Sequence, residues 1–211
     1  MKYYYTPPSI IKILFKNFYW STSNNKILLT FDDGPTDSVT LKILTILRAY
    51  KIKSVFFCVG DNIINHPELA KKILEDGHTI ANHTMNHKLL TQMNREESIK
   101  EIQIFNDLMK EKFNYDVKYF RPPHGRFNLK TNSILKELGL KCVMWNVLTY
   151  DFQNSIYKVK YGIDKYLRDN SIVVLHDNIK CSGIIEEELN YTIEQADKKG
   201  FKFGEPDDCL K

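Results

Sequence analysis

The chain has 211 residues, of which 43 % are hydrophobic and 27 % charged, and 30 Lys and Arg residues against 26 Asp and Glu residues give a net charge of +4. This length suits one or two domains, and the 12 % aromatic content with only 9 Gly and 7 Pro is typical of a folded chain rather than a disordered one. No block of five or six basic residues is present, so the charge balance does not indicate a nucleic-acid binder.

The amino-terminal region contains an apolar run at residues 10–15 that resembles an export signal only in part. Lys12 and Lys16 interrupt it, and no small-residue cleavage site follows. No stretch approaches the roughly 20 apolar residues that a spanning helix needs. The four cysteines are far apart and form no CxxC pair, which favours a reduced compartment, so the sequence predicts a cytoplasmic protein: Cys58, Cys142, Cys181 and Cys209.

Residues 1–23 form an amphipathic segment that we expect to pack on a single domain made of residues 24–211. A helix over residues 8–20 would present one apolar face to the domain. As an alternative, this helix would lie on a membrane surface with Lys12 and Lys16 at its rim. The side chains expected to contact the domain are Ile11, Leu14, Phe15 and Phe18.

Short β-branched or aromatic runs alternate with longer segments of helical period along the chain. The runs predict strands at 26–31, 53–59, 78–81, 117–120, 141–147, 171–175 and 201–203. The longer segments predict helices at 37–50, 66–76, 95–112, 128–138, 155–168 and 184–199.

This alternation implies right-handed βαβ crossovers and a mainly parallel sheet, because parallel strands need a connection as long as a helix. An open Rossmann-type sheet and a closed or nearly closed barrel both fit the pattern. No GxGxxG or GxxxxGK[ST] sequence is present, which argues against nucleotide-binding folds. Both architectures collect ligands at the carboxyl ends of the strands.

Two adjacent carboxylates, Asp32 and Asp33, follow the first predicted strand. Successive side chains of an extended segment point in different directions, so one carboxylate can bind a cation while the other addresses a substrate. An Asp-Asp-Gly-Pro turn formed for purely local reasons is the alternative.

An HxxxH pair, His83 and His87, follows the third predicted strand. If the segment is helical, the i, i+4 spacing places both imidazoles on one face. Two His and one carboxylate are a common ligand set for a catalytic Zn²⁺, and Co²⁺, Fe²⁺ or Mn²⁺ could use the same ligands. Four of the six histidines lie at or just after predicted strand ends, which favours a site over two exposed surface histidines: His83, His87, His124 and His176.

The fourth predicted strand is followed by an arginine, the fifth by an aspartate, and the sixth ends near a histidine. Two prolines stiffen the segment after Arg121, which we expect at the rim of the sheet with its guanidinium gripping a carboxylate through two hydrogen bonds. His176 ends the sixth predicted strand and suits a general acid, because a carboxylate such as Asp151 would raise its pKa. Trp145, on the fifth strand, is by itself more typical of a core than of a site.

Taken together, these residues resemble the five motifs of the NodB-homology polysaccharide deacetylases, also called carbohydrate esterase family 4. The resemblance covers about residues 24–203 and implies a single-domain, distorted (β/α)7 TIM-like barrel. It also implies a metal-dependent hydrolase that removes acetyl groups from amino sugars in a polysaccharide, oligosaccharide or precursor. The motifs are, in order, Thr30-Phe31-Asp32-Asp33-Gly34, His83-Thr84-x-x-His87, Arg121-Pro122-Pro123-x-Gly125, Asp151-Phe152 and Leu175-His176-Asp177.

The resemblance assigns roles to individual residues. It implies that the ligands of one divalent metal ion are Asp33, His83 and His87. It makes Asp32 the catalytic base, oriented by Arg121, and His176 the acid, supported by Asp151. The backbone N–H of His124 would help to bind the oxyanion. The substrate would be contacted by Pro123, Trp145 and Val174.

Four positions depart from the usual family motifs. Leu148 stands where an Asp is usual, Phe152 replaces a Trp, Val174 replaces a Leu that lines the acetyl pocket, and His124 stands in place of the usual aromatic residue. These changes affect the expected acyl group and substrate more than hydrolysis itself.

Two other functions stay open at this point. One is a metal-dependent hydrolase of another amide or ester, and the other is a carbohydrate-binding relative without turnover, against which the presence of Asp32 and His176 counts. In each case the partner is an amino sugar, a glycan or a related small molecule rather than a nucleic acid, and the sequence leaves the oligomeric state open.

Overall fold

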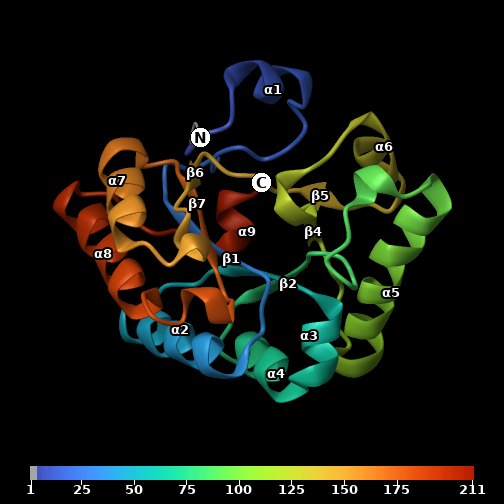
Figure 1. The fold of residues 1–211 in the computed structure, drawn as a ribbon, viewed down its shortest axis with the longest axis horizontal. Coiled ribbons are helices and arrows are strands. Elements are labelled where there is room, and N and C mark those ends of the chain that lie inside the picture. Colours follow the sequence, from blue (N-terminus) through green and yellow to red (C-terminus); the bar gives the residue numbers. More distant parts are fainter. Residues whose placement is uncertain (1–3) are drawn as a thin grey trace.

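The computed structural model describes residues 4–211, so residues 1–3 of the predicted amino-terminal segment lie outside the described residues. Seven parallel strands form one curled sheet in the order β5-β4-β3-β2-β1-β7-β6, with helices around its outside (Figure 1). This half-barrel confirms the expected distorted, mainly parallel TIM-like architecture. The strands are β1 (Leu28–Asp32), β2 (Val55–Cys58), β3 (Thr79–Asn82), β4 (Tyr119–Phe120), β5 (Lys141–Cys142), β6 (Val147–Leu148) and β7 (Ile172–His176).

The six predicted helices are all present, each within two residues of the expected ends: α2 (Asp37–Ala49), α4 (Pro67–Glu75), α5 (Arg95–Phe113), α6 (Leu129–Glu137), α7 (Ile156–Tyr166) and α8 (Ile185–Lys198). Local signals explain several of these boundaries. Pro67 occupies the first turn of α4, where a missing N–H costs nothing. Asn94 and Glu97 form a capping box at the start of α5. α1 (Ser9–Leu14) lies within the helix expected over residues 8–20. Two short helices and four single turns were not predicted: α3 (Gly60–Asn65), α9 (Pro206–Cys209) and the turns η1 (Leu90–Gln92), η2 (Pro123–Gly125), η3 (Asp151–Gln153) and η4 (Ile179–Cys181).

Two of the predicted strands were wrong. The segment 141–147 is divided into β5 and β6, because Met144 leaves the sheet and donates its N–H to the carbonyl of Tyr19. The segment 201–203 is not a strand; Phe203 forms only an isolated bridge with Ile27 before the chain turns toward α9.

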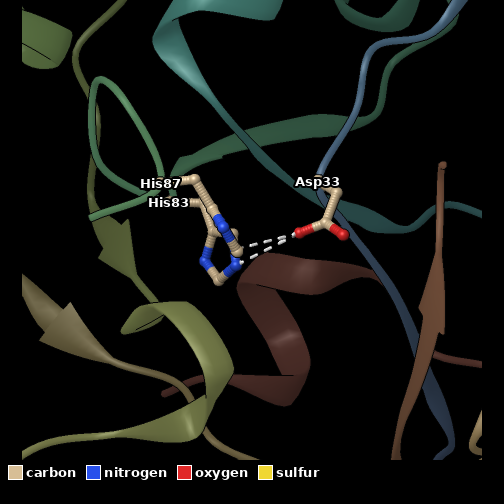
Figure 2. A group of neighbouring side chains, drawn as sticks. All are labelled: Asp33, His83 and His87. Carbon is tan, nitrogen blue, oxygen red and sulfur yellow. Dashed lines mark ion pairs between the residues drawn. The ribbon is translucent and has the colours of Figure 1, made fainter. Parts of the chain in front are cut away.

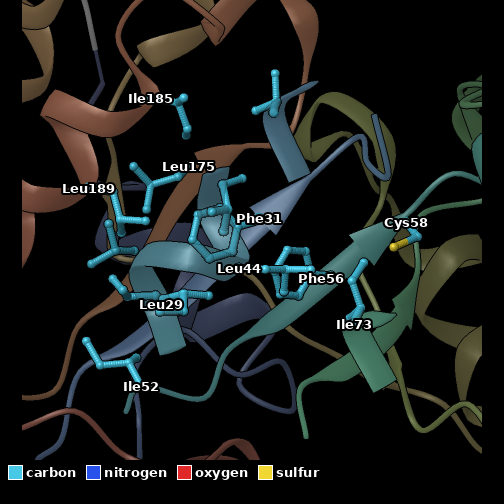
Figure 3. Packing of buried hydrophobic residues seen from close by; sticks show 14 of the residues in the cluster. Leu29, Phe31, Leu44, Ile52, Phe56, Cys58, Ile73, Leu175, Ile185 and Leu189 are labelled. Carbon is cyan, nitrogen blue, oxygen red and sulfur yellow. The ribbon is translucent and has the colours of Figure 1, made fainter. Parts of the chain in front are cut away.

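Alternating strand residues build two cores on the two faces of the sheet. On the outer face, Phe31 and Phe56 stack at 5.0 Å and pack beneath α2 and α8 (Figure 3). On the inner face, Leu28 and Phe57 pack with Leu210, so the carboxyl-terminal residues fill one end of the half-barrel. This leaves the other end of the half-barrel, at the carboxyl ends of the strands, open for a site.

The amino-terminal segment joins both edges of the sheet. Tyr19 forms a bridge with Val143 beside β5, and the carbonyl of Tyr5 accepts a hydrogen bond from the N–H of Leu148 in β6. Phe15 and Phe18 are buried, whereas Leu14 is 65 % exposed. The expected helix over 8–20 was therefore too long, since only α1 is helical, and the expected packing of Leu14 was wrong.

Within residues 4–211, none of the helices combines the length and apolar character needed to cross a membrane. The division of the chain at residues 23 and 24 stays a prediction.

Candidate active site

The two carboxylates at the end of β1 point to different partners. Asp32 is buried inside the half-barrel, where its Oδ1 accepts a hydrogen bond of 2.6 Å from Arg121. Asp33 has a positive φ of 77°, so its side chain turns toward the histidines of the next loop. Asn62 donates to the Asp33 carbonyl at 2.6 Å and stabilises this unusual backbone conformation.

Arg121 lies deep in the half-barrel rather than at its rim, and the expected two-bond grip on a carboxylate was wrong. The side chain is completely buried and gives a single N–H to Asp32. Three further N–H groups donate to Thr30 Oγ1 and to the carbonyls of Val143 and Met144. These bonds fix the planar guanidinium, which in turn holds Asp32 in one orientation.

His83 and His87 meet without forming a helix. The segment between them is irregular, and positive φ angles at Thr84 (69°) and His87 (55°) fold it back on itself. The two rings approach to 5.1 Å between centroids. Figure 2 shows both imidazoles directed toward Asp33, whose Oδ1 lies 3.6 Å from Nε2 of His83 and 3.2 Å from Nε2 of His87. The helical explanation of the HxxxH spacing was therefore wrong, although the two rings do face one carboxylate.

Asp33, His83 and His87 together form a group that could hold a metal ion, since one ligand atom from each lies within 4.8 Å of the others. His83 Nδ1 lies 2.7 Å from the carbonyl of Arg121, so this nitrogen carries the proton and Nε2 keeps its lone pair free for a metal. Burial lowers the pKa of His83 to about 4 despite the nearby carboxylates, which keeps the imidazole neutral at neutral pH.

The charge state of Asp33 also suits a cation. Burial by itself would raise the pKa of its carboxyl, but a hydrogen bond from His87 and the neighbouring histidines hold the pKa well below its usual range. A carboxylate with two imidazoles is a donor set that divalent transition metals accept. The residues present therefore fit a metal such as Zn²⁺.

His176 and Asp151 form a close pair on the opposite side of the site. His176 Nδ1 lies 2.7 Å from Asp151 Oδ1, and the His176 backbone N–H donates to the other carboxylate oxygen at 2.5 Å. Burial by itself would lower the pKa of His176, but the charge and hydrogen bonds of Asp151, with Asp32 and Asp33 nearby, raise it to about 9. The imidazole is thus protonated at neutral pH, and Asp151 fixes its Nδ1 as a donor.

One cavity of about 510 Å³ brings these groups together. The predicted site residues that line it are Asp32, Asp33, His83, His87, His124, Trp145, Val174 and His176. Arg121 and Asp151 are completely buried behind it, and Pro123 is buried and does not line it. The His124 ring lies against His87 at 4.7 Å between centroids.

Sequence reasoning missed Asn178 and gave no role to Asp177, which it had included in the fifth motif. Asn178 donates to the second oxygen of Asp33 at 3.1 Å, and its place two residues after His176 could have indicated it. Asp177 accepts hydrogen bonds from the hydroxyls of Thr36 and Thr40 at 2.9 and 2.6 Å. Burial raises the pKa of Asp177 to about 7, although these hydrogen bonds oppose that shift. Asp177 thus anchors the turn between β1 and α2.

Comparisons with known proteins point to a single protein family. A family profile described as polysaccharide deacetylase matches residues 20–143. The peptidoglycan-N-acetylglucosamine deacetylase PgdA of Listeria monocytogenes is 31 % identical over 185 residues, which are 86 % of this chain but only 38 % of the Listeria protein. The peptidoglycan-N-acetylglucosamine deacetylase of Bacillus cereus is 31 % identical over 189 residues, covering 87 % of this chain and 88 % of that protein.

Solved structures show the same architecture. The crystal structure of the Bc1960 peptidoglycan N-acetylglucosamine deacetylase superposes with a TM-score of 0.86 at 27 % identity and covers 97 % of both chains. A pseudoenzyme of the CE4 family from Bacillus anthracis superposes with a TM-score of 0.82 at 22 % identity, covering 91 % of this chain and 68 % of that one. The latter likeness concerns the fold alone.

Proposed function

The chain belongs to the polysaccharide deacetylase family, and from this we propose that it is a metal-dependent hydrolase that removes N-acetyl groups from amino sugars. One observation carries the proposal. A metal-binding group, a buried carboxylate held by an arginine, and a protonated histidine held by a second carboxylate all belong to one cavity. The relatives named as peptidoglycan N-acetylglucosamine deacetylases support a glycan that contains N-acetylglucosamine as the substrate.

Asp33, His83 and His87 would hold the metal ion, for which we propose Zn²⁺. When bound, such an ion supplies a Lewis acid that polarises the acyl carbonyl and acidifies water. Asn178 would keep Asp33 directed toward the ion through the oxygen that the histidines do not face.

Asp32 would accept the proton of the attacking water. Arg121 binds only Oδ1 of Asp32, so the other oxygen is left to act as the base. Because the Arg121 side chain is completely buried, the carboxylate cannot rotate away from this geometry. A positioned base of this kind contributes about 10²- to 10⁴-fold to a rate.

His176 would protonate the departing amine, which leaves poorly as an anion. Its Nδ1 is engaged by Asp151, so Nε2 is the nitrogen that can carry a proton into the cavity. The backbone N–H of His124, which lines the same cavity, would stabilise the developing oxyanion. Val174 and Trp145 would contact the acyl group and the sugar.

The test measures acetate release from N-acetylglucosamine oligomers. We expect the wild-type protein to release acetate, chelation to abolish release, and added Zn²⁺ to restore it. Asp32→Asn is expected to lower kcat by about 10²- to 10⁴-fold. Asp61→Asn is the matched control, because Asp61 lines the same cavity but has no assigned step.

Two outcomes would contradict the proposal. Full activity of Asp32→Asn would exclude Asp32 as the base. Release of a different acid from non-sugar amides or esters, with no acetate from any amino sugar, would indicate another hydrolase of the same fold.

A further inference from the structure

Glu188, in the first turn of α8, is a buried acid that the proposed mechanism does not use. It is 0 % exposed, and no N–H or O–H group of the described residues donates a hydrogen bond to either of its carboxyl oxygens. The two preceding acids of the same turn are exposed and paired, Glu186 with Lys42 and Glu187 with Lys160. Glu188 therefore differs from these two neighbours, because it is shielded from solvent and has no cationic partner within residues 4–211.

The group that Glu188 faces is the carboxyl of Asp151. Burial first, and then the charge and proximity of Asp151, raise the pKa of Glu188 well above its usual range, and no cation opposes this shift. The thiol of Cys181, also buried, is the other titratable group beside both acids, and burial raises its pKa as well. Asp151 itself stays ionised, because His176 and its hydrogen bonds outweigh the effect of burial on its pKa.

An isolated ionised carboxylate in such a place would cost several kcal/mol, so Glu188 is neutral and carries an O–H donor. Two carboxyl groups in contact are stable when one proton lies between them. The acceptor available to Glu188 is the Asp151 carboxylate.

We propose that Glu188 is a positioning residue of this site: its protonated carboxyl donates a hydrogen bond to Asp151 and so holds the carboxylate that fixes His176. The inference rests on the proposed function, in which His176 is the acid. The donated hydrogen bond also draws negative charge away from Asp151. This limits how far Asp151 raises the pKa of His176, which must release its proton in the reaction.

The first test reads the protonation of His176 by NMR in the metal-free protein, where the facing groups are Asp151, Asp32 and Asp33. Glu188→Gln keeps a neutral donor and is expected to leave the pKa of His176 unchanged. Glu188→Leu removes the donor, concentrates charge on Asp151, and is expected to raise that pKa. If both variants lower the pKa of His176, Glu188 is ionised. If neither variant changes this pKa, Glu188 is not coupled to Asp151 and His176. Either result overturns the proposal.

Infrared spectra provide a second test that does not need Glu188→Leu to fold. The difference spectrum of the wild-type protein and Glu188→Gln, in which the contribution of Asp177 cancels, is expected to show the carbonyl band of one buried protonated acid, and this band is expected to shift in Asp151→Asn. An absent band, or a band that Asp151→Asn leaves in place, contradicts the proposal.

Acetate release completes the experiment. Glu188→Leu is expected to lower kcat by about tenfold, the scale for losing an outer hydrogen-bond partner, with KM unchanged. Glu188→Gln is expected to restore most of the rate, and the exposed Glu187→Gln is the control. If the wild-type protein releases no acetate from any substrate, the proposed function fails, whereas the NMR and infrared results still decide the role of Glu188.

Discussion

The depth of a side chain is the property that the sequence predicted least well at the candidate site. Asp32, Arg121 and His176 do share one site, as expected from strand ends that meet at the same edge of a parallel sheet. The sequence does not encode how far each side chain reaches inward, because this depends on the curl of the sheet. Arg121 therefore lies on the Phe57 ring, 4.0 Å from its centroid, rather than at the rim.

His78 provides a residue-level test of the fold at a distance from the candidate site. It is 5 % exposed, and its Nδ1 accepts the N–H of Ser54 at 3.2 Å. Burial, reinforced by the charge of Lys53, lowers the pKa of His78 to about 4 from 6.5. The unfolded chain therefore binds this proton more readily, and we expect His78 to cost about 3 kcal/mol of stability as the pH falls from 6.5 to 4.

The measurement is the free energy of unfolding in urea between pH 4 and pH 7. His78→Asn is the comparison, because an asparagine oxygen can accept the same N–H but does not titrate. The wild-type protein should lose stability relative to this variant only below pH 6.5. Parallel curves for the two proteins would show that His78 does not contribute to acid lability.

At the scale of elements, long periodic segments were predicted correctly and short or irregular ones were not. The six longer helices have enough turns to show a 3.6-residue period, whereas the six residues of α3 do not. The loop from His83 to His87 depends on two residues with positive φ, for which neither threonine nor histidine is a strong signal. The division between β5 and β6 depends on contacts with the distant amino-terminal segment, which no local pattern contains.

The turn after β4 provides a test at this scale. Gly125 has a φ of +64°, and a Cβ there would lie 2.3 Å from Cη2 of Trp145. Gly139, after α6, has a similar φ of +67° but nothing within 4 Å of its Cβ position. We expect Gly139→Ala to cost about 1 kcal/mol of stability through backbone strain alone, and Gly125→Ala to cost a further ~1–3 kcal/mol because Trp145 must move.

Urea unfolding of the two variants measures this difference. Acetate release should fall in Gly125→Ala and stay near the wild-type level in Gly139→Ala, because only Gly125 lines the cavity with Trp145. Equal losses of stability would mean that Trp145 moves aside without cost.

Considered as a whole, the molecule is a sheet whose two edges do not pair with each other. β5 and β6 are the outer strands, and the amino-terminal segment contacts both through Tyr19 and Tyr5. Phe15 and Phe18 pack with Phe127 at centroid distances of 4.8 and 5.2 Å. The segment is thus part of the packed structure next to the candidate site.

Phe18→Ala tests how much the whole fold depends on this segment. Phe18 is 5 % exposed, so its truncation should lower the free energy of unfolding by about 3–5 kcal/mol. Tyr157→Ala, at a side chain that is 84 % exposed, should change it by less than about 0.5 kcal/mol. If Phe18→Ala costs no more than this control, residues 24–211 would be stable without the segment.

The double attachment of the amino-terminal segment has a consequence for synthesis on the ribosome. Phe15, Phe18 and Trp20 leave the exit tunnel early, but Val143 and Leu148, which lie where the segment bonds to the sheet, emerge only after most of the other strands. Contacts between such distant positions form late, so the aromatic cluster stays exposed on the nascent chain until β5 and β6 have been synthesised. This segment is therefore one that chaperones binding apolar segments would shield until β5 and β6 arrive.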